Sequence, residues 1–84
     1  MLLYHYRAVG GVQMPVLHDG DEKSLREMFK SSVTPIVSVV SLDDQQVREA
    51  ELVKLRQRLQ KTRKSQIGLR FNLEQVIQSW PSGN

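Results

Sequence analysis

Residues 2–17 read LLYHYRAVGGVQMPVL, and their pattern predicts two strands joined by a tight turn. In residues 2–9 aromatic and aliphatic side chains alternate with polar ones, which is the two-residue period of a half-buried strand. Gly10 and Gly11 supply the positive φ angles of a tight hairpin turn, so the rest of the stretch returns as a second strand. Pro15 cannot donate a ladder hydrogen bond, which places the second strand at a sheet edge or makes it irregular.

A short helix and a third strand follow the hairpin. Asp21 is placed to cap the N-terminus of this helix. The apolar residues of the helix share one face at the i, i+3, i+4 spacing, and they are Leu25, Met28 and Phe29. Residues 36–42, IVSVVSL, are nearly apolar and rich in β-branched side chains, which predicts an interior strand covered on both faces.

A long helix is predicted for the next part of the chain. It starts at Asp43 or Asp44. Its end falls near Ile67, with Gly68 as a left-handed stop. Its apolar stripe has heptad-like spacing and consists of Leu52, Leu55 and Leu59. Such a stripe packs either on the sheet or on a partner helix, and a homodimer through it is one alternative.

The last predicted helix has a complete set of N-terminal signals. Asn72 caps it, with Gln75 as the capping-box partner. Phe71 is expected to pack onto Val76 across the cap. The buried face consists of Leu73, Val76, Ile77 and Trp80.

The order β-β-α-β-α-α indicates an α+β fold, in which a small antiparallel sheet, the hairpin plus one further strand, is covered by helices. With 84 residues, we expect one domain over residues 1–80 and a frayed tail over residues 81–84. The chain has no cysteine and no run of 18 apolar residues, so neither disulfides nor a membrane span is expected. A cytoplasmic location fits this composition best.

The net charge of +3 is unevenly distributed. Residues 1–47 have a net charge of −2, whereas residues 48–70 have eight cations against two anions and a net charge of +6. The candidate binding residues of this basic helix are Lys54, Arg58, Lys61, Arg63 and Lys64. On a helical projection the first three share one flank of the leucine stripe, while Arg56 and Arg63 fall on the other. Three interpretations stay open: a solvated helix, a nucleic-acid surface, and a site for an acidic protein or lipid surface.

No motif of the sequence predicts catalysis or metal binding. His5 and His18 have no nucleophile motif beside them. Residues 18–22 lack the ligand spacing of a calcium loop and are explained by a helix cap with an acidic first turn. Neither a P-loop nor a dinucleotide-binding glycine pattern is present, so no cofactor is expected.

Several short motifs follow one another in the first half of the chain. Residues 4–8, YHYRA, precede the hairpin, Asp19 precedes the short helix, and residues 33–35, VTP, lead into the strand at residues 36–39. With these features, residues 1–42 resemble the N-terminal cytoplasmic segment of the inner-membrane platform proteins of type II secretion and type IV pilus systems. The hairpin is shorter than that family's and lacks its characteristic glycines. The resemblance implies an assembly module that contacts other proteins and has no active site.

Together these features favour a non-enzymatic interaction module, a small regulator or assembly factor. It would bind a partner protein through the long basic helix and a sheet edge. The alternative is a nucleic-acid-binding regulator whose basic helix contacts phosphates. A helix-turn-helix reader is disfavoured, because the exposed residues of the last helix include neither arginine nor lysine.

Overall fold

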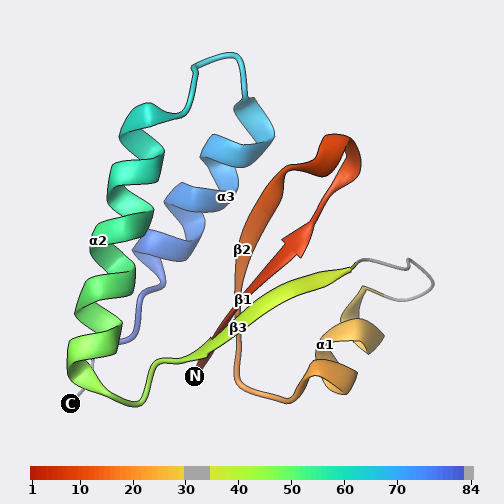
Figure 1. The fold of residues 1–84 in the computed structure, drawn as a ribbon, viewed down its shortest axis with the longest axis vertical. Helices are drawn as coiled ribbons and strands as arrows, with labels where there is room; N and C mark the ends of the chain where they lie inside the picture. Colours follow the sequence, from red (N-terminus) through yellow and green to blue (C-terminus); the bar gives the residue numbers. More distant parts are fainter. Residues whose placement is uncertain (30–34, 83–84) are drawn as a thin grey trace. The chain divides into compact units, whose positions relative to one another are not determined.

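A computed structural model of the chain describes residues 1–29 and 35–82. The chain forms two compact units, which we call the sheet unit, residues 1–41, and the helical unit, residues 42–84 (Figure 1). The described elements follow the order β-β-α-β-α-α, with one turn of 3-10 helix between the first two strands. The α+β fold class and the small antiparallel sheet are therefore confirmed.

The sheet unit is built on three antiparallel strands in the order β2-β1-β3. These strands are β1 (Leu2–Arg7), β2 (Gln13–His18) and β3 (Ile36–Ser41). In the register, Tyr4 of β1 lies opposite a valine on each side, Val16 of β2 and Val39 of β3. The first strand in the sequence is thus the central strand of the sheet.

The hairpin between β1 and β2 has the predicted glycine turn. Gly10 has φ 85° and Gly11 has φ 80°, which are left-handed backbone values that residues with a Cβ rarely adopt. The turn is closed by a hydrogen bond from the Ala8 N–H to the Val12 carbonyl, at 2.8 Å. Pro15 lies in an edge strand, as predicted, and its ring is buried.

The prediction that β3 is an interior strand is wrong. Among the described residues β3 pairs only with β1, so it lies at the edge of the sheet. Val37 is 39% exposed and Val39 is 52% exposed. The β-branched residues of this segment indicate that it fits a pleated surface, which does not require burial on both faces. The register with β1 also shifts between His5 and Tyr6, an irregularity that bends the edge strand.

The core of the sheet unit includes Leu3 and Tyr4, which are consecutive residues of β1. Because neighbouring side chains of a strand point to opposite faces, the predicted pattern with one buried face is too simple for β1. The Tyr4 hydroxyl donates to the Gly20 carbonyl at 3.1 Å. The Tyr6 ring packs against Phe29, with 5.1 Å between the ring centroids.

Helix α1 (Glu22–Met28) begins at the predicted cap. Asp21 Oδ1 accepts a hydrogen bond from the Ser24 N–H at 2.9 Å. Leu25 is fully buried, but Met28 is 64% exposed, so its predicted place on the buried face is wrong. Residues 30–34, which hold the threonine and valine of the VTP motif, lie outside the described residues.

The helical unit is a hairpin of two packed helices, α2 (Gln45–Lys61) and α3 (Ile67–Gln78), that run side by side in opposite directions (Figure 1). Asp44, one of the two predicted starting residues, is the N-cap of α2, and its Oδ1 accepts from the backbone N–H groups of the first turn at 2.8 and 3.2 Å. The predicted end of this helix near Ile67 is wrong, because α2 ends at Lys61 and Ile67 begins α3.

Three further predictions fail for the same reason. Gly68 is not a helix stop and Asn72 is not a helix cap, because both lie inside α3. Phe71 is also within α3 and is 62% exposed, so it cannot act as the expected staple onto Val76. The buried face of α3 does contain Leu73 and Val76, as predicted, and adds Leu69. Ile77 and Trp80 are half-buried, and residues 83–84 of the predicted tail lie outside the described residues.

The end of α2 is held by side chains and not by a glycine. The Thr62 hydroxyl donates to the Arg58 carbonyl at 2.7 Å. Arg70, from α3, donates through Nη1 to the carbonyls of Leu59 and Thr62 at 3.3 and 2.9 Å. The last carbonyls of a helix have no partner within the helix. The two bonds from Arg70, which we call the Arg70 clamp, satisfy two of these carbonyls from α3.

Candidate functional site

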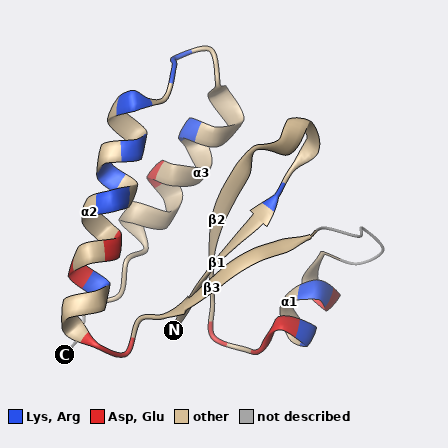
Figure 2. Cartoon of the chain, in the orientation of Figure 1, with Lys and Arg blue, Asp and Glu red and all other residues tan. Residues whose placement is uncertain are grey.

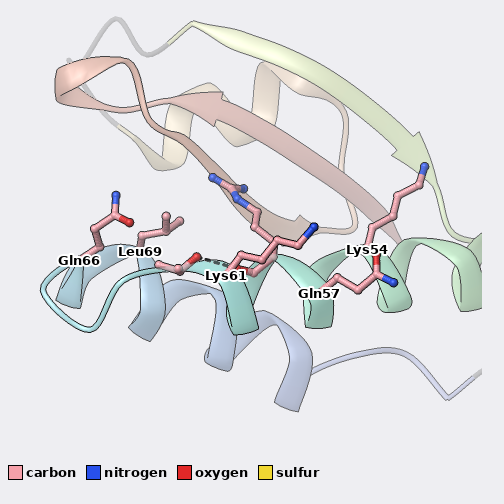
Figure 3. Close-up of a pocket in the computed structure, with 7 residues that line it drawn as sticks. Lys54, Gln57, Lys61, Gln66 and Leu69 are labelled. Carbon is pink, nitrogen blue, oxygen red and sulfur yellow. Dashed lines mark hydrogen bonds between the residues drawn. The ribbon is translucent and has the colours of Figure 1, made fainter.

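A pocket of about 490 Å³ lies along the C-terminal half of α2 and the start of α3 (Figure 3). We call it the basic pocket, and its lining residues are Lys54, Gln57, Arg58, Lys61, Thr62, Gln66 and Leu69. Three of them are cationic, three others carry an amide or a hydroxyl group, and one is apolar. No carboxylate is among the lining residues, so the pocket has the charge and hydrogen-bonding groups to receive an anionic group.

The three cations come together because they follow one another at i, i+4 and i+7 along α2. Lys54 Nζ lies 3.3 Å from Glu51 Oε1, so part of its charge is compensated within the helix. Lys61 has no carboxylate at ion-pair distance in residues 1–29 and 35–82. Its ammonium group is therefore available to an incoming anion.

Arg58 differs from the two lysines because its side chain is half-buried. The loss of hydration lowers the pKa of its guanidinium group from the usual value, although arginine stays charged at every physiological pH. A partly desolvated cation gains more from an anion than one that water surrounds. Arg58 is consequently the residue of the pocket that we expect to contribute most to binding.

Two lining residues, Gln66 and Leu69, could not be assigned to this pocket from the sequence. Gln66 and Leu69 reach the pocket because the chain turns after Thr62 and returns as α3 (Figure 3). The predicted long helix, which ended near Ile67, included Gln66. No glycine or proline marks the turn in residues 62–66, so local composition contained no signal for it.

Arg63 and Lys64, the other two predicted binding residues, lie in the connection between α2 and α3 and are exposed. The placement of Arg63 on the far flank of the helix is therefore wrong. Residues 52–73 nevertheless contain seven cations and no anion, and Figure 2 shows them along α2, the connection and the start of α3. The five predicted residues thus belong to one continuous basic segment, of which three line the pocket.

The leucine stripe is less accessible than the cations. Leu55 is only 3% exposed, and Leu52 and Leu59 are half-buried. A partner helix could reach only the edges of this stripe. The homodimer through these residues stays a prediction.

The second predicted surface is a sheet edge, and the sheet has two of them: β2, the edge predicted from Pro15, and β3, which was predicted to be interior. β3 is the one without a proline. Its sequence, IVSVVS, contains no charged residue. No strand lies beyond β3 in the described part of the chain. An uncharged edge strand with exposed valines is able to pair with an added strand.

The histidines lie in the sheet unit and belong to structural contacts. His18 Nε2 lies 2.8 Å from Ser24 Oγ, but this hydroxyl also donates to the Asp21 carbonyl at 2.9 Å, as part of the α1 cap. His5 Nδ1 lies 3.3 Å from Ser38 Oγ on the neighbouring strand. Within residues 1–29 and 35–82, no three His, Asp or Glu side chains form a group that could hold a metal ion.

Comparisons with known protein families, with curated proteins and with solved structures find no match. Among the described residues, the helices lack the length and the apolar character that crossing a membrane requires.

Proposed function

We propose that this chain is a non-enzymatic interaction module, a small regulator or assembly factor, that binds an acidic partner protein. The basic pocket supports this proposal more than any other feature, because it combines Lys54, Arg58 and Lys61 with hydrogen-bond donors and no carboxylate. Charge-assisted hydrogen bonds to Asp or Glu side chains of a partner are stronger than neutral ones. A carboxylate that enters the pocket would also lie beside the partly desolvated guanidinium group of Arg58.

The apolar part of the pocket favours a protein partner. Leu69 is 9% exposed and lines the pocket beside the aliphatic stems of the lysines. An acidic side chain with an apolar neighbour would contact both kinds of surface. The β3 edge offers a second site, at which an extended segment of the partner adds to the sheet.

A nucleic-acid-binding regulator is the second candidate function. It is favoured by one observation, the absence of any anion among the seven cations of residues 52–73. In this alternative Lys54, Arg58, Lys61, Arg63 and Lys64 contact phosphates without reading the base sequence.

Site-specific photo-crosslinking tests the proposal. A photoreactive residue in place of Gln57, inside the basic pocket, should form a covalent product with one partner protein in cells that express the chain. The charge reversal Lys61→Glu should abolish this product, whereas Lys23→Glu, an equal change on exposed α1, should leave it intact. A product that survives Lys61→Glu, or no protein product at all, would contradict the proposal.

Salt titration separates the two candidate functions. Fluorescence anisotropy with a short DNA duplex and a single-stranded RNA should detect no binding at low salt if the partner is a protein. Nucleic-acid binding would instead weaken log-linearly with salt, and each Lys or Arg replaced by Ala would reduce the slope by about one. Such a result would favour the second candidate.

A further inference from the structure

The outer face of α3 exposes two large apolar side chains one helical turn apart. Ile67 is 75% exposed and Phe71 is 62% exposed, which are the highest values for large apolar residues in the described part of the helical unit. A groove of about 250 Å³ beside them is lined by Lys64, Ile67, Arg70, Phe71 and Glu74. An exposed apolar surface with polar residues around it is typical of an interface.

The charges at the two ends of this face have opposite signs. Lys64 precedes the apolar pair and Glu74 follows it. Glu74 is the only carboxylate of residues 52–84, and its side chain is 48% exposed. Its Oε1 is 3.9 Å from Arg70 Nη2, a long contact, while the other guanidinium nitrogen holds the Arg70 clamp.

We propose that the outer face of α3 binds the same face of a second copy of this chain, as a symmetric antiparallel helix pair. In such an interface, if residue i of one copy contacts residue j of the other, then residue j of the first copy contacts residue i of the second. With the axis at the level of Leu69, Lys64, in the connection just before α3, lies at the end of the pair nearest Glu74 of the second copy. Ile67 then lies opposite Phe71 of the second copy, each two positions away.

Gly68 makes a close approach of the two helices feasible. It lies inside α3, is exposed, and has no atom within 4 Å of the place where a Cβ would stand. The absence of a side chain next to the two-fold axis leaves room for Phe71 of the second copy. A glycine inside a helix costs stability relative to alanine, and close contact with a partner gives it a role.

The charge pattern identifies the occupant. A uniformly acidic partner would leave Glu74 beside like charges, which is unfavourable, whereas the same face in reverse order compensates both Lys64 and Glu74. One helix face is small for a protein interface, so the dimer is weak and exchanges rapidly. None of the four paired side chains lines the basic pocket, so the dimer and the proposed partner binding succeed or fail independently.

Sedimentation equilibrium of the whole chain over a range of concentrations, at low salt, tests the dimer. The wild-type chain should associate, and Phe71→Ala should raise the dissociation constant about tenfold or more. Val53→Ala is a matched control, because Val53 is 51% exposed on α2 and should leave association unchanged. Circular dichroism should show the same helix content for all variants, since the altered side chains are exposed. A wild-type chain that stays monomeric at every concentration, or an unchanged dimer of Phe71→Ala, would overturn the proposal.

A charge swap tests the register. Lys64→Glu and Glu74→Lys should each weaken the dimer, because each places like charges opposite one another across the axis. The double variant Lys64→Glu/Glu74→Lys restores opposite charges and should associate about as well as the wild type. A double variant that associates no better than the single variants would rule out the antiparallel register and with it the proposed interface.

Discussion

The two units use charged residues in different ways. The sheet unit has four cations and four anions, whereas the helical unit has eight cations and five anions. In the helical unit two arginines stabilise the backbone: Arg48 donates to the Leu42 carbonyl at 2.7 Å, and Arg70 forms the clamp. Part of the positive charge of this unit therefore serves to bind backbone carbonyls. A net charge alone overstates the number of cations that a partner can contact.

The largest effect should come from the two cores. Leu25 and Leu73 are both fully buried, one in each unit, and we expect Leu25→Ala and Leu73→Ala to lower the free energy of unfolding by about 3 kcal/mol each. Trp80, the only tryptophan, reports on the helical unit by fluorescence, while circular dichroism reports on both units. Leu73→Ala should shift the fluorescence transition in urea.

The same pair of variants tests whether the two units unfold independently. Amide hydrogen exchange should accelerate mainly in α1 and the strands for Leu25→Ala, and mainly in α2 and α3 for Leu73→Ala. Equal acceleration in all elements by either variant would show that the two units unfold as one.

A smaller effect is expected at the Arg70 clamp. Both bonds of the clamp come from Nη1, and a lysine side chain keeps the charge but is one atom shorter, so Arg70→Lys should destabilise the chain by about 2 kcal/mol in urea denaturation. Arg63→Lys, in the exposed connection, is the control and should be nearly neutral. Equal stability of Arg70→Lys and the wild type would mean that the clamp does not hold the end of α2.

The cap of α2 should have a still smaller effect. Asp44→Ala removes the acceptor for two backbone N–H groups and should cost about 1 kcal/mol, measured by thermal unfolding followed at Trp80. Asp44→Asn retains an acceptor oxygen and should lose much less. If both variants lost the same stability, the negative charge and not the cap would be responsible.

The smallest effect concerns the cap of α1 and depends on pH. Backbone hydrogen bonding from Ser24 lowers the pKa of Asp21 in the folded state. Its contribution to stability is therefore complete above the unfolded-state pKa of about 3.9 and is lost as the pH falls through the folded-state pKa. Asp21→Asn keeps the cap but should abolish this pH dependence. Carboxyl NMR titration measures the pKa directly, and a value at or above that of an unfolded peptide would contradict the prediction.

Local signals explain which parts of the fold the sequence predicts. The glycine turn at Gly10 and Gly11 and the cap at Asp21 depend on neighbouring residues and were found where predicted. The start of α2 was predicted at Asp43 or Asp44, and Asp44 is its cap. The end of α2 was not predicted, because the clamp donor, Arg70, is eight residues beyond Thr62. The position of β3 at the edge was not predicted either, because strand order depends on pairing between distant segments.

For the candidate site, too, the part that depends on neighbouring residues was predicted and the part that depends on distant residues was not. The flank of Lys54, Arg58 and Lys61 follows from helical spacing within a single element. Gln66 and Leu69 join it only after the chain reverses direction, which happens after Lys61 and not at the predicted stop, Gly68. The exposed face of Ile67 and Phe71 was not predicted either, because α3 begins at Ile67 and the last helix was predicted to begin after Asn72.

The central position of β1 has a consequence for synthesis on the ribosome. β1 meets its neighbours at different times: its pairing with β2 begins between Arg7 and Gln13, whereas the pairing of Leu2 with Ser41 spans the whole sheet unit. Until β3 emerges, the hairpin presents the other edge of β1 to the surroundings. During this interval we expect chaperones that recognise extended segments to compete for that edge, and the arrival of β3 to end the competition.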